Sequence, residues 1–313
     1  MKRAIMILLS VGIMAIIFWR IDVQELKRYI VEVDVHWLVL AVMLFIPQIY
    51  VSAYRWQMMV ADRISVSLWE CTKLALAAAS LNILVPSRVG DLSKPYFMGK
   101  IKGWNMHRGL NVVVFEKYID LASLAIVILT GTVWSLQADS TTLFGVSFSL
   151  AVLAVFPVIY FIRLDRWAAL PFWGRHKILR KMGEFLLESQ MYLNDIKTNH
   201  GRVTQIIGVS VGLWFLHIIQ FYVFFLAFHS QVSVFDVFRL VPIAILVGLL
   251  PLTVAGVGTR DSAMIYLFKP LEEVSLIVGV GLFVSLRYFV PGLLGLPFLN
   301  QYVVKSGMPK DGG

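Results

Sequence analysis

The chain has 313 residues, of which 58% are hydrophobic and 15% charged, whereas charged residues make up about a quarter of soluble globular proteins. This composition excludes a soluble domain and indicates an integral membrane protein. The formal net charge of +9 does not indicate nucleic-acid binding, because the basic residues stand at the ends of apolar runs, as positive-inside topology requires. The single cysteine, Cys71, excludes an intramolecular disulfide and a cysteine-based metal site.

Six apolar stretches are predicted to cross the bilayer, whose core needs about 20 residues. They cover residues 4–19, 36–60, 109–136, 143–164, 203–228 and 274–299. The first follows Lys2 and Arg3 as in a signal peptide. No small-x-small cleavage site precedes Arg20, and we therefore expect a retained anchor.

Two further apolar segments are interrupted by proline, glycine and charged residues. The segment over 74–98 is broken by Pro86-Ser87-Arg88-Val89-Gly90-Asp91 and resumes at Lys94-Pro95-Tyr96-Phe97. The segment over 240–268 is broken by Ala255-Gly256-Val257-Gly258-Thr259-Arg260-Asp261. Each is either a re-entrant hairpin or two closely spaced spans, because proline removes a backbone donor and glycine permits a reversal. Two such broken segments in two halves of a chain point to a transporter's binding site.

Charge placement orients the chain if the broken segments are re-entrant and basic flanks are cytoplasmic. The loop over 163–202 is the strongest cytoplasmic mark, with eight Lys or Arg against four Asp or Glu. Arg55 and Arg63 are counted as another cytoplasmic flank. Both termini are then cytoplasmic, and the units 36–136 and 203–299 enter the membrane from opposite sides.

The fold expected is therefore an all-α polytopic membrane protein, with about six spanning helices and two broken or re-entrant hairpins arranged as an inverted repeat. Residues 1–313 form one membrane domain, with a first repeat over 36–136, a cytoplasmic amphipathic loop over 165–202 and a second repeat over 203–299. Residues 67–74 and 233–240 match in apolar, acidic and basic positions, which supports the repeat.

Within the cytoplasmic loop, apolar residues recur at helical spacing between charged ones, which predicts an amphipathic helix. These residues are Ile178, Met182, Phe185, Leu186 and Leu193. The helix lies either on the cytoplasmic membrane surface or on the protein's own cytoplasmic face.

Four charged residues fall inside predicted spans: Glu116, Lys117, Asp120 and Arg287. A charge at the bilayer centre costs about 2.5 to 3.5 kcal/mol, and such residues face the protein interior or a water-filled cavity. Glu116 and Asp120 share one helical face and need a basic partner. Arg88 and Lys94 are the nearest candidates, and Arg287 is a candidate partner of Asp261. These charges either form internal ion pairs or bind a substrate, and both alternatives place them in one central cavity.

The hairpin tips suit an anionic group, because a half-helix that ends in the membrane presents unpaired N–H groups and a positive dipole end. Gly90, Gly256 and Gly258 permit either close backbone approach or only the reversal. Asn82 either faces the cavity or bonds across helices, and His217 is expected to make an interhelical bond. The candidate substrate-binding residues are Asn82, Arg88, Asp91, Lys94, Glu116, Lys117, Asp120, Arg260, Asp261 and Arg287.

Three motifs in this order resemble the lysylphosphatidylglycerol synthase transmembrane-region family, the flippase-like membrane domain of UPF0104 proteins. They are Arg88-Val89-Gly90-Asp91 with Lys94-Pro95-Tyr96, Glu116-Lys117-x-x-Asp120, and 255–261. The chain departs from the family pattern at four places. It has Asp91 and Asp261 where the family pattern has Glu, Lys117 where the pattern has Arg, and Val254-Ala255 where the pattern has Pro-Gly. The resemblance covers about residues 40–299 and implies a translocase of a lipid or lipid-linked headgroup, or a membrane partner of a glycolipid or cell-envelope pathway.

Larger relatives fuse this domain to a cytoplasmic aminoacyltransferase domain, which these 313 residues do not contain, and aminoacyl transfer is not expected. The sequence has no H-E-x-x-H, phosphate-loop or G-x-S-x-G motif. We therefore expect no enzymatic activity, no cofactor and no metal site.

Three hypotheses follow. The first is a bacterial inner-membrane flippase-like carrier, in which Arg88, Lys94 and Arg260 bind an anionic headgroup and the nearby carboxylates position them or carry a coupling proton. It is driven by the membrane potential, by a proton gradient, or downhill. The second is an accessory protein that presents lipid to a glycosyltransferase partner through the amphipathic helix. The third is a membrane-embedded transferase that acts on a polyprenyl phosphate, with Glu116 or Asp120 as base.

Overall fold

The computed structural model describes residues 2–61, 63–85, 90–135, 139–168, 170, 173, 176–249, 253 and 256–307, and this part of the chain is helical without strands. The helices in chain order are α1 (Lys2–Arg20), α2 (Val23–Val31), α3 (Val35–Met43), α4 (Phe45–Val60), α5 (Leu68–Leu84), α6 (Gly90–Lys102), α7 (Met106–Ser135), α8 (Ser140–Phe161), α9 (Leu164–Ala168), α10 (Lys177–Thr198), α11 (His200–Ala227), α12 (Val234–Leu249), α13 (Thr259–Phe268), α14 (Val274–Val284), α15 (Leu286–Leu294) and α16 (Leu296–Gly307).

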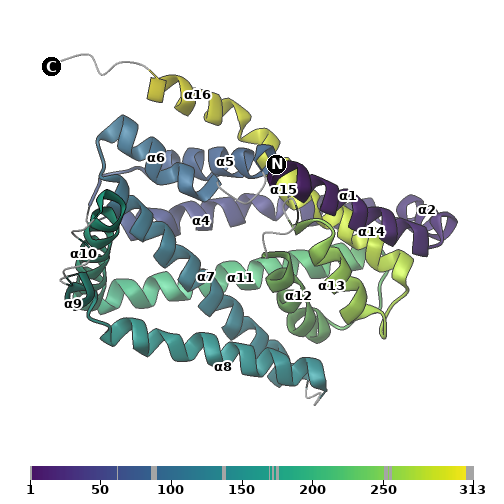
Figure 1. Ribbon diagram of the computed structural model, residues 1–313. Helices are drawn as coiled ribbons and strands as arrows, with labels where there is room; N and C mark the ends of the chain where they lie inside the picture. Colours follow the sequence, from purple (N-terminus) through teal and green to yellow (C-terminus); the bar gives the residue numbers. More distant parts are fainter. Residues whose placement is uncertain are drawn as a thin grey trace.

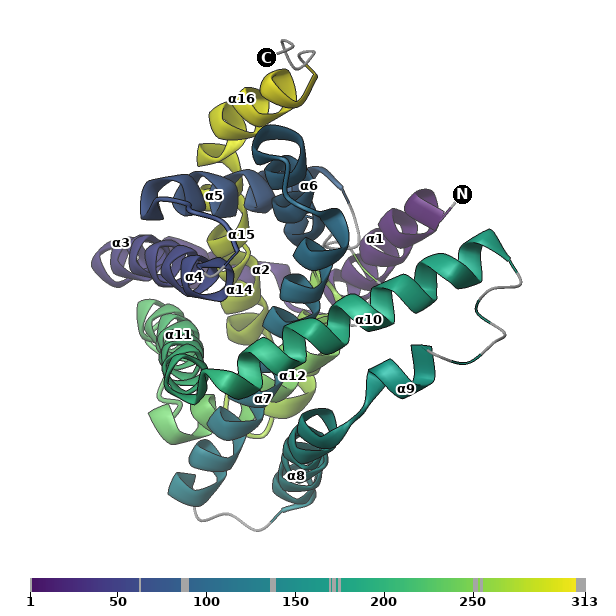
Figure 2. The same ribbon diagram turned by 90° about the vertical axis from the view of Figure 1, so that its left-hand side faces the viewer.

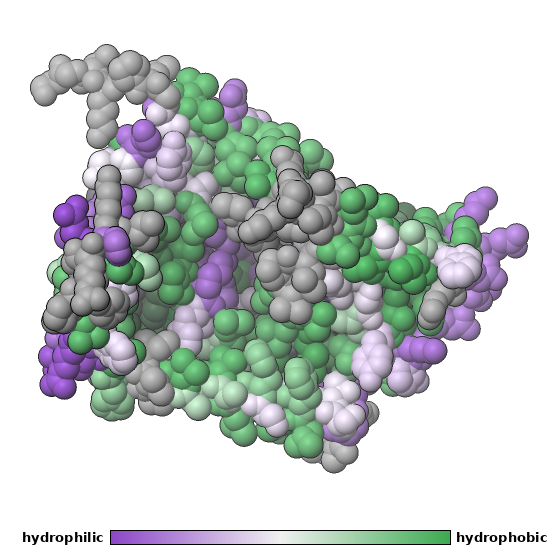
Figure 3. Space-filling model, in the orientation of Figure 1, coloured by the Kyte–Doolittle hydropathy of each residue, from purple (hydrophilic) through white to green (hydrophobic). Residues whose placement is uncertain are grey.

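The long helices form a bundle between two ends of the molecule. In Figure 1, α4, α7, α8 and α11 run between the left end, where α9 and α10 lie, and the right end, where α2 lies. Figure 2 looks onto the left end and shows α10 lying across it, in front of α7. Figure 3 shows hydrophobic side chains along the flank of the bundle, and hydrophilic ones at the two ends and in one hollow left of centre. This distribution suits a bundle whose flanks face lipid.

Three helical stretches among the described residues are long and apolar enough to cross a membrane. They are Val35–Val60, His200–Ala227 and Val274–Leu294, and they coincide with three of the six predicted spans. The other three predicted spans are also helical, as α1, α7 and α8. The expected all-helical membrane fold is confirmed at this level.

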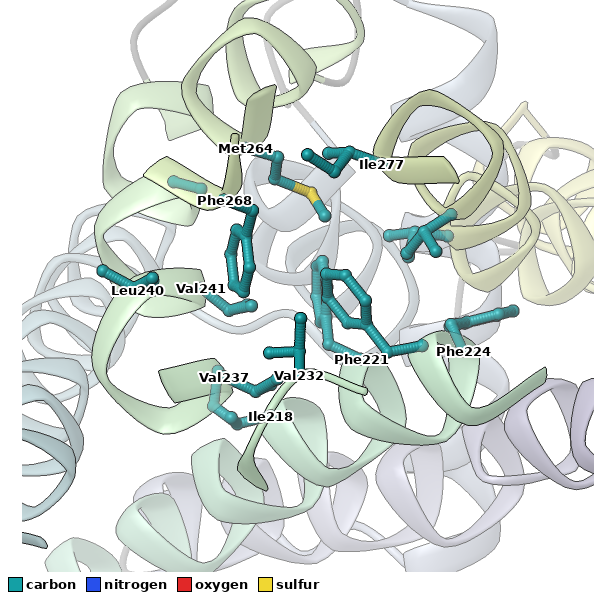
Figure 4. Close-up of a cluster of buried hydrophobic side chains, with 14 of the residues drawn as sticks. Ile218, Phe221, Phe224, Val232, Val237, Leu240, Val241, Met264, Phe268 and Ile277 are labelled. Carbon is teal, nitrogen blue, oxygen red and sulfur yellow. The ribbon is translucent and has the colours of Figure 1, made fainter. Parts of the chain in front are cut away.

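Buried apolar side chains gather in two main clusters. One lies where α11 packs on α12, α13 and α14, with Phe221, Phe224, Val241 and Phe268 at its centre (Figure 4). The other joins α4, α5, α6 and α7. Each cluster therefore holds one of the two broken helical segments in place.

Both matching octapeptides begin a helix. Ser67 and Glu70 form a capping box at the start of α5, in which each side chain accepts from the other residue's backbone N–H. Ser233 precedes α12, and its hydroxyl accepts from the backbone N–H of Phe235 at 3.2 Å. The shared sequence pattern is thus a shared helix start.

Each broken segment forms two adjacent helices, α5 with α6 and α12 with α13. A Cβ atom on Gly90 would lie 2.0 Å from the carbonyl oxygen of Ala78, so glycine is required for the close approach of α6 to α5. Gly256 and Gly258 have φ angles of +77° and +95°, a region that favours glycine. Residues 86–89, 250–252 and 254–255, with Arg88 among them, lie outside the described residues.

The amphipathic helix predicted in the long loop is α10, and it packs on the protein itself. Ser189 donates to Asn111 of α7 at 2.7 Å, and the ring of Tyr192 meets the ring of Phe115 edge-on, with centroids 5.5 Å apart. The structure therefore favours the second of the two positions expected for this helix.

Candidate functional site

Six charged side chains from α4, α6 and α7 form a closed ring of ion pairs inside the bundle, here called the ion ring. Its members are Arg55, Asp91, Lys94, Glu116, Lys117 and Asp120. Three cations alternate with three carboxylates around the ring, so its formal charge is zero. Charges inside a membrane are expensive, and mutual pairing offsets much of that cost.

Arg55 of α4 joins the two carboxylates that the sequence places on one face of α7. Its guanidinium lies 2.6 Å from Asp120 and 3.0 Å from Glu116, and it also donates to the hydroxyl of Ser210 on α11 at 3.2 Å. The indole N–H of Trp214 donates to Asp120 at 3.3 Å. The expectation that Glu116 and Asp120 need a basic partner is confirmed.

The assignment of Arg55 to a cytoplasmic flank is wrong, because the side chain is only 3% exposed and α4 continues to Val60. A basic residue near the end of an apolar run is ordinarily a flank. The missed signal was its position inside the predicted span 36–60, where a charge needs an internal partner as much as Glu116 does.

Lys94 and Lys117 complete the ring through Asp91. Lys94 lies 3.1 Å from Glu116 and 3.4 Å from Asp91, as predicted for a partner of Glu116, and its ammonium also lies 4.7 Å from the centroid of the Trp56 ring. Lys117 lies 2.5 Å from Asp91 and 3.5 Å from Asp120. Because Lys117 is half exposed, with 50% of its side chain accessible, it is the ring cation best placed to meet a ligand.

A cavity of about 550 Å³ adjoins the ion ring, between helices of both halves of the chain. Its polar lining includes Gln48, Ser52, Asn82, Asp91, Lys117, His217, Arg287 and Tyr288. Its apolar lining includes Phe45, Ile49, Ile83, Ile245 and Leu249. The cavity volume lies in the range of small-ligand sites, and the mixed lining suits a molecule with one polar and one apolar part.

Arg287 of α15 and His217 of α11 line the cavity together. The guanidinium of Arg287 lies 2.8 Å from Nδ1 of His217 and 5.0 Å from the centroid of the Phe221 ring. The predicted pairing of Arg287 with Asp261 is wrong, because Asp261 is bound by its own neighbour Arg260. The interhelical bond expected of His217 is confirmed.

The second tip forms a compact internal ion pair. Arg260 donates from Nε and Nη2 to Asp261 at 2.9 and 2.5 Å, and from Nη2 to the carbonyl oxygen of Gly281 at 3.0 Å. The backbone N–H of Gly258 donates to the other carboxylate oxygen of Asp261 at 2.9 Å. Both charged residues are buried and lie outside the cavity lining, so their contacts indicate a structural role at this tip.

Asn82 combines the two roles that the sequence left open. Its side-chain oxygen accepts from the backbone N–H of Gly90 at 2.9 Å, and the residue also lines the cavity. Among the described residues, no group of three or more His, Cys, Asp and Glu side chains is arranged to hold a metal ion.

The sequence profile described as the lysylphosphatidylglycerol synthase TM region matches residues 3–295. The chain belongs to this family. It is similar to a UPF0104 membrane protein of Methanothermobacter thermautotrophicus, with 23% identity over 288 residues that make up 86% of this chain and 85% of the relative. It is also similar to a UPF0104 membrane protein of Methanocaldococcus jannaschii, with 22% identity over 192 residues, which are 60% of this chain and 79% of the relative.

The family resemblance carried by the three sequence motifs is thereby confirmed. Membership of the lysylphosphatidylglycerol synthase TM-region family, together with the apolar helices, identifies a multi-pass membrane protein of a lipid-related family. In this family member, Asp91 of the first motif pairs with Lys117 of the α7 motif, and Lys94 pairs with Glu116, so both motifs contribute to the ion ring.

This member of the family has a second polar cavity, of about 460 Å³, beneath α10. Arg63 and Arg108 line it, and they form ion pairs with Asp195 and Glu188 of α10. The guanidinium of Arg63 also lies 4.4 Å from the centroid of the Tyr192 ring. These pairs attach α10 to the end of the bundle.

Proposed function

We propose that the protein is a flippase-like transporter of an anionic lipid or lipid-linked headgroup across the bacterial inner membrane, with both termini cytoplasmic. The observation that carries the proposal is the cavity, in which Lys117 and Arg287 share a space of about 550 Å³ with apolar side chains. Charged groups inside a membrane-embedded bundle mark substrate pathways. A phosphate would meet the two cations, and the start of an acyl or prenyl chain would meet the apolar wall.

The arrangement of the broken segments supports an inverted repeat of 36–136 and 203–299 with re-entrant hairpins. Close to α10, which lies at the left end in Figure 1 and whose Asp195 pairs with Arg63, Lys102 at the end of α6 donates to the carbonyl oxygen of Ser65 before α5 at 3.1 Å. Close to α2, which lies at the right end in Figure 1 and whose Glu25 lines one pocket with Glu272, the backbone N–H of Gln231 before α12 donates to Glu272 after α13 at 2.8 Å. The two helical pairs therefore open toward opposite ends of the bundle.

Cysteine labelling tests this topology in a Cys71→Ser background. Ser65 and Lys269 are both exposed and lie at the open ends of the two hairpins. Single cysteines at these positions should react with an impermeant maleimide from opposite faces of the membrane. Labelling of both positions from the same face would contradict the inverted topology.

Mass spectrometry of co-purifying lipids tests the headgroup site. Wild-type protein should carry one anionic or polyprenyl-phosphate lipid above its share of the membrane, and Lys117→Gln should lose it. The matched control is Lys100→Gln, since Lys100 is exposed at the end of α6. If wild type and Lys117→Gln carry only bulk lipid in bulk proportions, the charges are internal ion pairs and the transporter proposal fails.

The accessory hypothesis keeps one structural argument, which is the apolar surface that α10 leaves exposed. Met182, Leu187 and Met191 are between 46% and 49% exposed, and they form the surface that a glycosyltransferase partner would contact. Met182→Ser with Leu187→Ser should leave lipid movement in proteoliposomes intact if the protein is a transporter. The accessory function would be favoured if this double variant folds but does not support the cellular function, and if the wild-type protein moves no lipid in proteoliposomes.

A further inference from the structure

We infer that α15 presents Arg287 and Tyr288 to the headgroup and is fixed at its two ends by one residue from each broken segment. These two positioning residues are Arg260 of α13 and Ser80 of α5. The inference rests on the proposed transport function and deepens it, because it gives the two broken segments a shared role at one binding site. Both positioning residues lie outside the described cavity lining and act on the headgroup through α15.

The helix α15 has nine residues and a break at each end, one toward α14 and one toward α16. At the first break the backbone N–H of Ser285 donates to the carbonyl oxygen of Leu282, three residues earlier, at 3.1 Å, which is a tightened turn. The residues of this helix that line the cavity are Arg287, Tyr288 and Pro291. Because so short a helix has little stability of its own, its position depends on contacts made at the two breaks.

Arg260 of the second tip binds the break between α14 and α15. The carbonyl oxygen of Gly281 accepts from Nη2 of Arg260 at 3.0 Å and from the hydroxyl of Ser285 at 3.3 Å. In a continuous helix this carbonyl would accept from the backbone N–H of Ser285, so the guanidinium takes a place that the break leaves open. A Cβ atom on Gly281 would lie 3.0 Å from the carboxylate of Asp261, so glycine permits the close approach of the tip.

Arg260 also lies close to the first turn of α15. Its guanidinium carbon lies 5.9 Å from the centroid of the Tyr288 ring, and that of Arg287 lies 5.2 Å from the same centroid. Both distances are within the range of cation–π attraction. A displacement of Arg260 would therefore reach the cavity guanidinium through one aromatic ring.

Ser80 of the first broken segment binds the other end of α15. Its hydroxyl donates to the carbonyl oxygen of Gly292 at 2.6 Å, and the residue is fully buried. A Cβ atom on Gly295 would lie 2.1 Å from the carbonyl oxygen of Leu76, so the second break lies against the backbone of α5. The two broken segments thus hold α15 from both ends.

A double-mutant cycle on headgroup affinity tests whether Arg260 acts through Arg287. The probe is fluorescent phosphatidylglycerol, or a fluorescent polyprenyl phosphate if wild type prefers it, and anisotropy in detergent reports binding. Arg260→Gln is combined with Asp261→Asn, because removing one partner would leave a buried charge unpaired. This change should weaken binding on the order of tenfold in the wild-type background, and by less than about twofold in Arg287→Gln. Equal losses in the two backgrounds would overturn the inference.

Ser80→Ala is a milder variant that removes the hydrogen bond to Gly292 and no charge. It should weaken binding in the wild-type background and have little further effect in Arg287→Gln. The matched control is Ser123→Ala on α7, since Ser123 is only 1% exposed and lies outside the described cavity lining. Wild-type affinity in Ser80→Ala would overturn the role assigned to Ser80.

Distances between spin labels test the position of α15 without any lipid. In a Cys71→Ser background, labels replace Phe289 of α15 and Leu143 of α8, which are 48% and 68% exposed. The distance distribution should shift or broaden in the variant of the second tip and in Ser80→Ala, and it should stay as in wild type in Ser123→Ala. A wild-type distribution in both positioning variants would overturn the inference.

The wild-type protein separates failure of this inference from failure of the proposed function. If it binds neither phosphatidylglycerol nor a polyprenyl phosphate more tightly than phosphatidylcholine, the anionic-headgroup site is wrong and the inference falls with it. If it prefers an anionic lipid and Arg287→Gln removes the preference, the headgroup site stands. The double-mutant cycle and the label distances then decide the inference alone.

Discussion

The guanidinium of Arg55 on α4 lies 3.0 Å from the carboxylate of Glu116 on α7, and the two side chains are 3% and 2% exposed. This contact joins α4 to α7 through two residues that are 61 positions apart in the sequence. Arg55 also holds Glu116 and Asp120 in place behind Asp91 and Lys117, the two members of the ion ring that line the cavity.

Removing the charge of Arg55 should destabilise the protein strongly. Arg55→Met leaves Glu116 and Asp120 buried with fewer donors, and breaking a buried pair by deleting one partner costs about 3 to 5 kcal/mol. Thermal unfolding in detergent should show a marked fall in melting temperature for Arg55→Met. The melting temperature of Arg55→Lys should lie between those of Arg55→Met and wild type. Arg180→Met, which alters an exposed pair on α10, serves as the control. Equal melting temperatures for Arg55→Met and Arg180→Met would contradict the role assigned to Arg55.

Gly131 of α7 should not tolerate a side chain. A Cβ atom there would lie 2.5 Å from the carbonyl carbon of Phe238 and 2.6 Å from the backbone nitrogen of Arg239 on α12, so α7 and α12 would have to separate. Gly131→Ala should lose about 1 to 3 kcal/mol and reduce the yield of folded protein on size-exclusion chromatography. Gly208→Ala on α11 is the matched control, because nothing lies within 4 Å of its Cβ position and alanine favours the helix.

The pair between Asp139 and Arg239 should make stability depend on pH in the acid range. Partial burial acts to raise the pKa of Asp139, but hydrogen bonds from the backbone N–H of Thr142 and from Arg239 outweigh it and lower the pKa from 3.8 to about 2. Because the pKa of Asp139 is lower in the folded than in the unfolded state, its ionised form stabilises the folded protein at pH values above the unfolded pKa. This stabilisation is lost as pH falls from about 4 toward 2. The difference in melting temperature between wild type and Asp139→Asn should therefore decrease as the pH falls through this range. A constant difference between the two proteins from pH 6 to pH 2.5 would refute the linkage.

Tyr192 should control how firmly α10 is attached. The side chain is 6% exposed and lies between the ring of Phe115 and the guanidinium of Arg63. Truncating a buried aromatic side chain costs roughly 3 kcal/mol or more, so Tyr192→Ala should speed hydrogen exchange and proteolysis within α10. Met191→Ala changes a neighbour that is 48% exposed, and it should leave both rates as in wild type. Identical exchange in the two variants would show that α10 is held by other contacts.

The sequence by itself determined the class of protein, most of its helices and its family. Hydropathy, helix caps and the motifs around Asp91, Glu116 and Asp261 are local properties of the chain, and they predict membrane helices broken at two places. The sequence also determined that Glu116 and Asp120 need a basic partner, and it named Lys94 as one candidate, because helical spacing and the cost of a charge in the membrane are known without a fold.

Only the tertiary structure decided which charges meet. Arg55 belongs to the ion ring, Arg287 contacts His217 instead of Asp261, and Arg260 pairs with the adjacent residue Asp261. The same packing decided that Lys117 and Asp91 line the cavity, whereas Glu116 lies behind them. The physical reason is that an ion pair depends on distances of a few ångströms between helices far apart in the chain, and hydropathy and spacing report only on the helix that carries them.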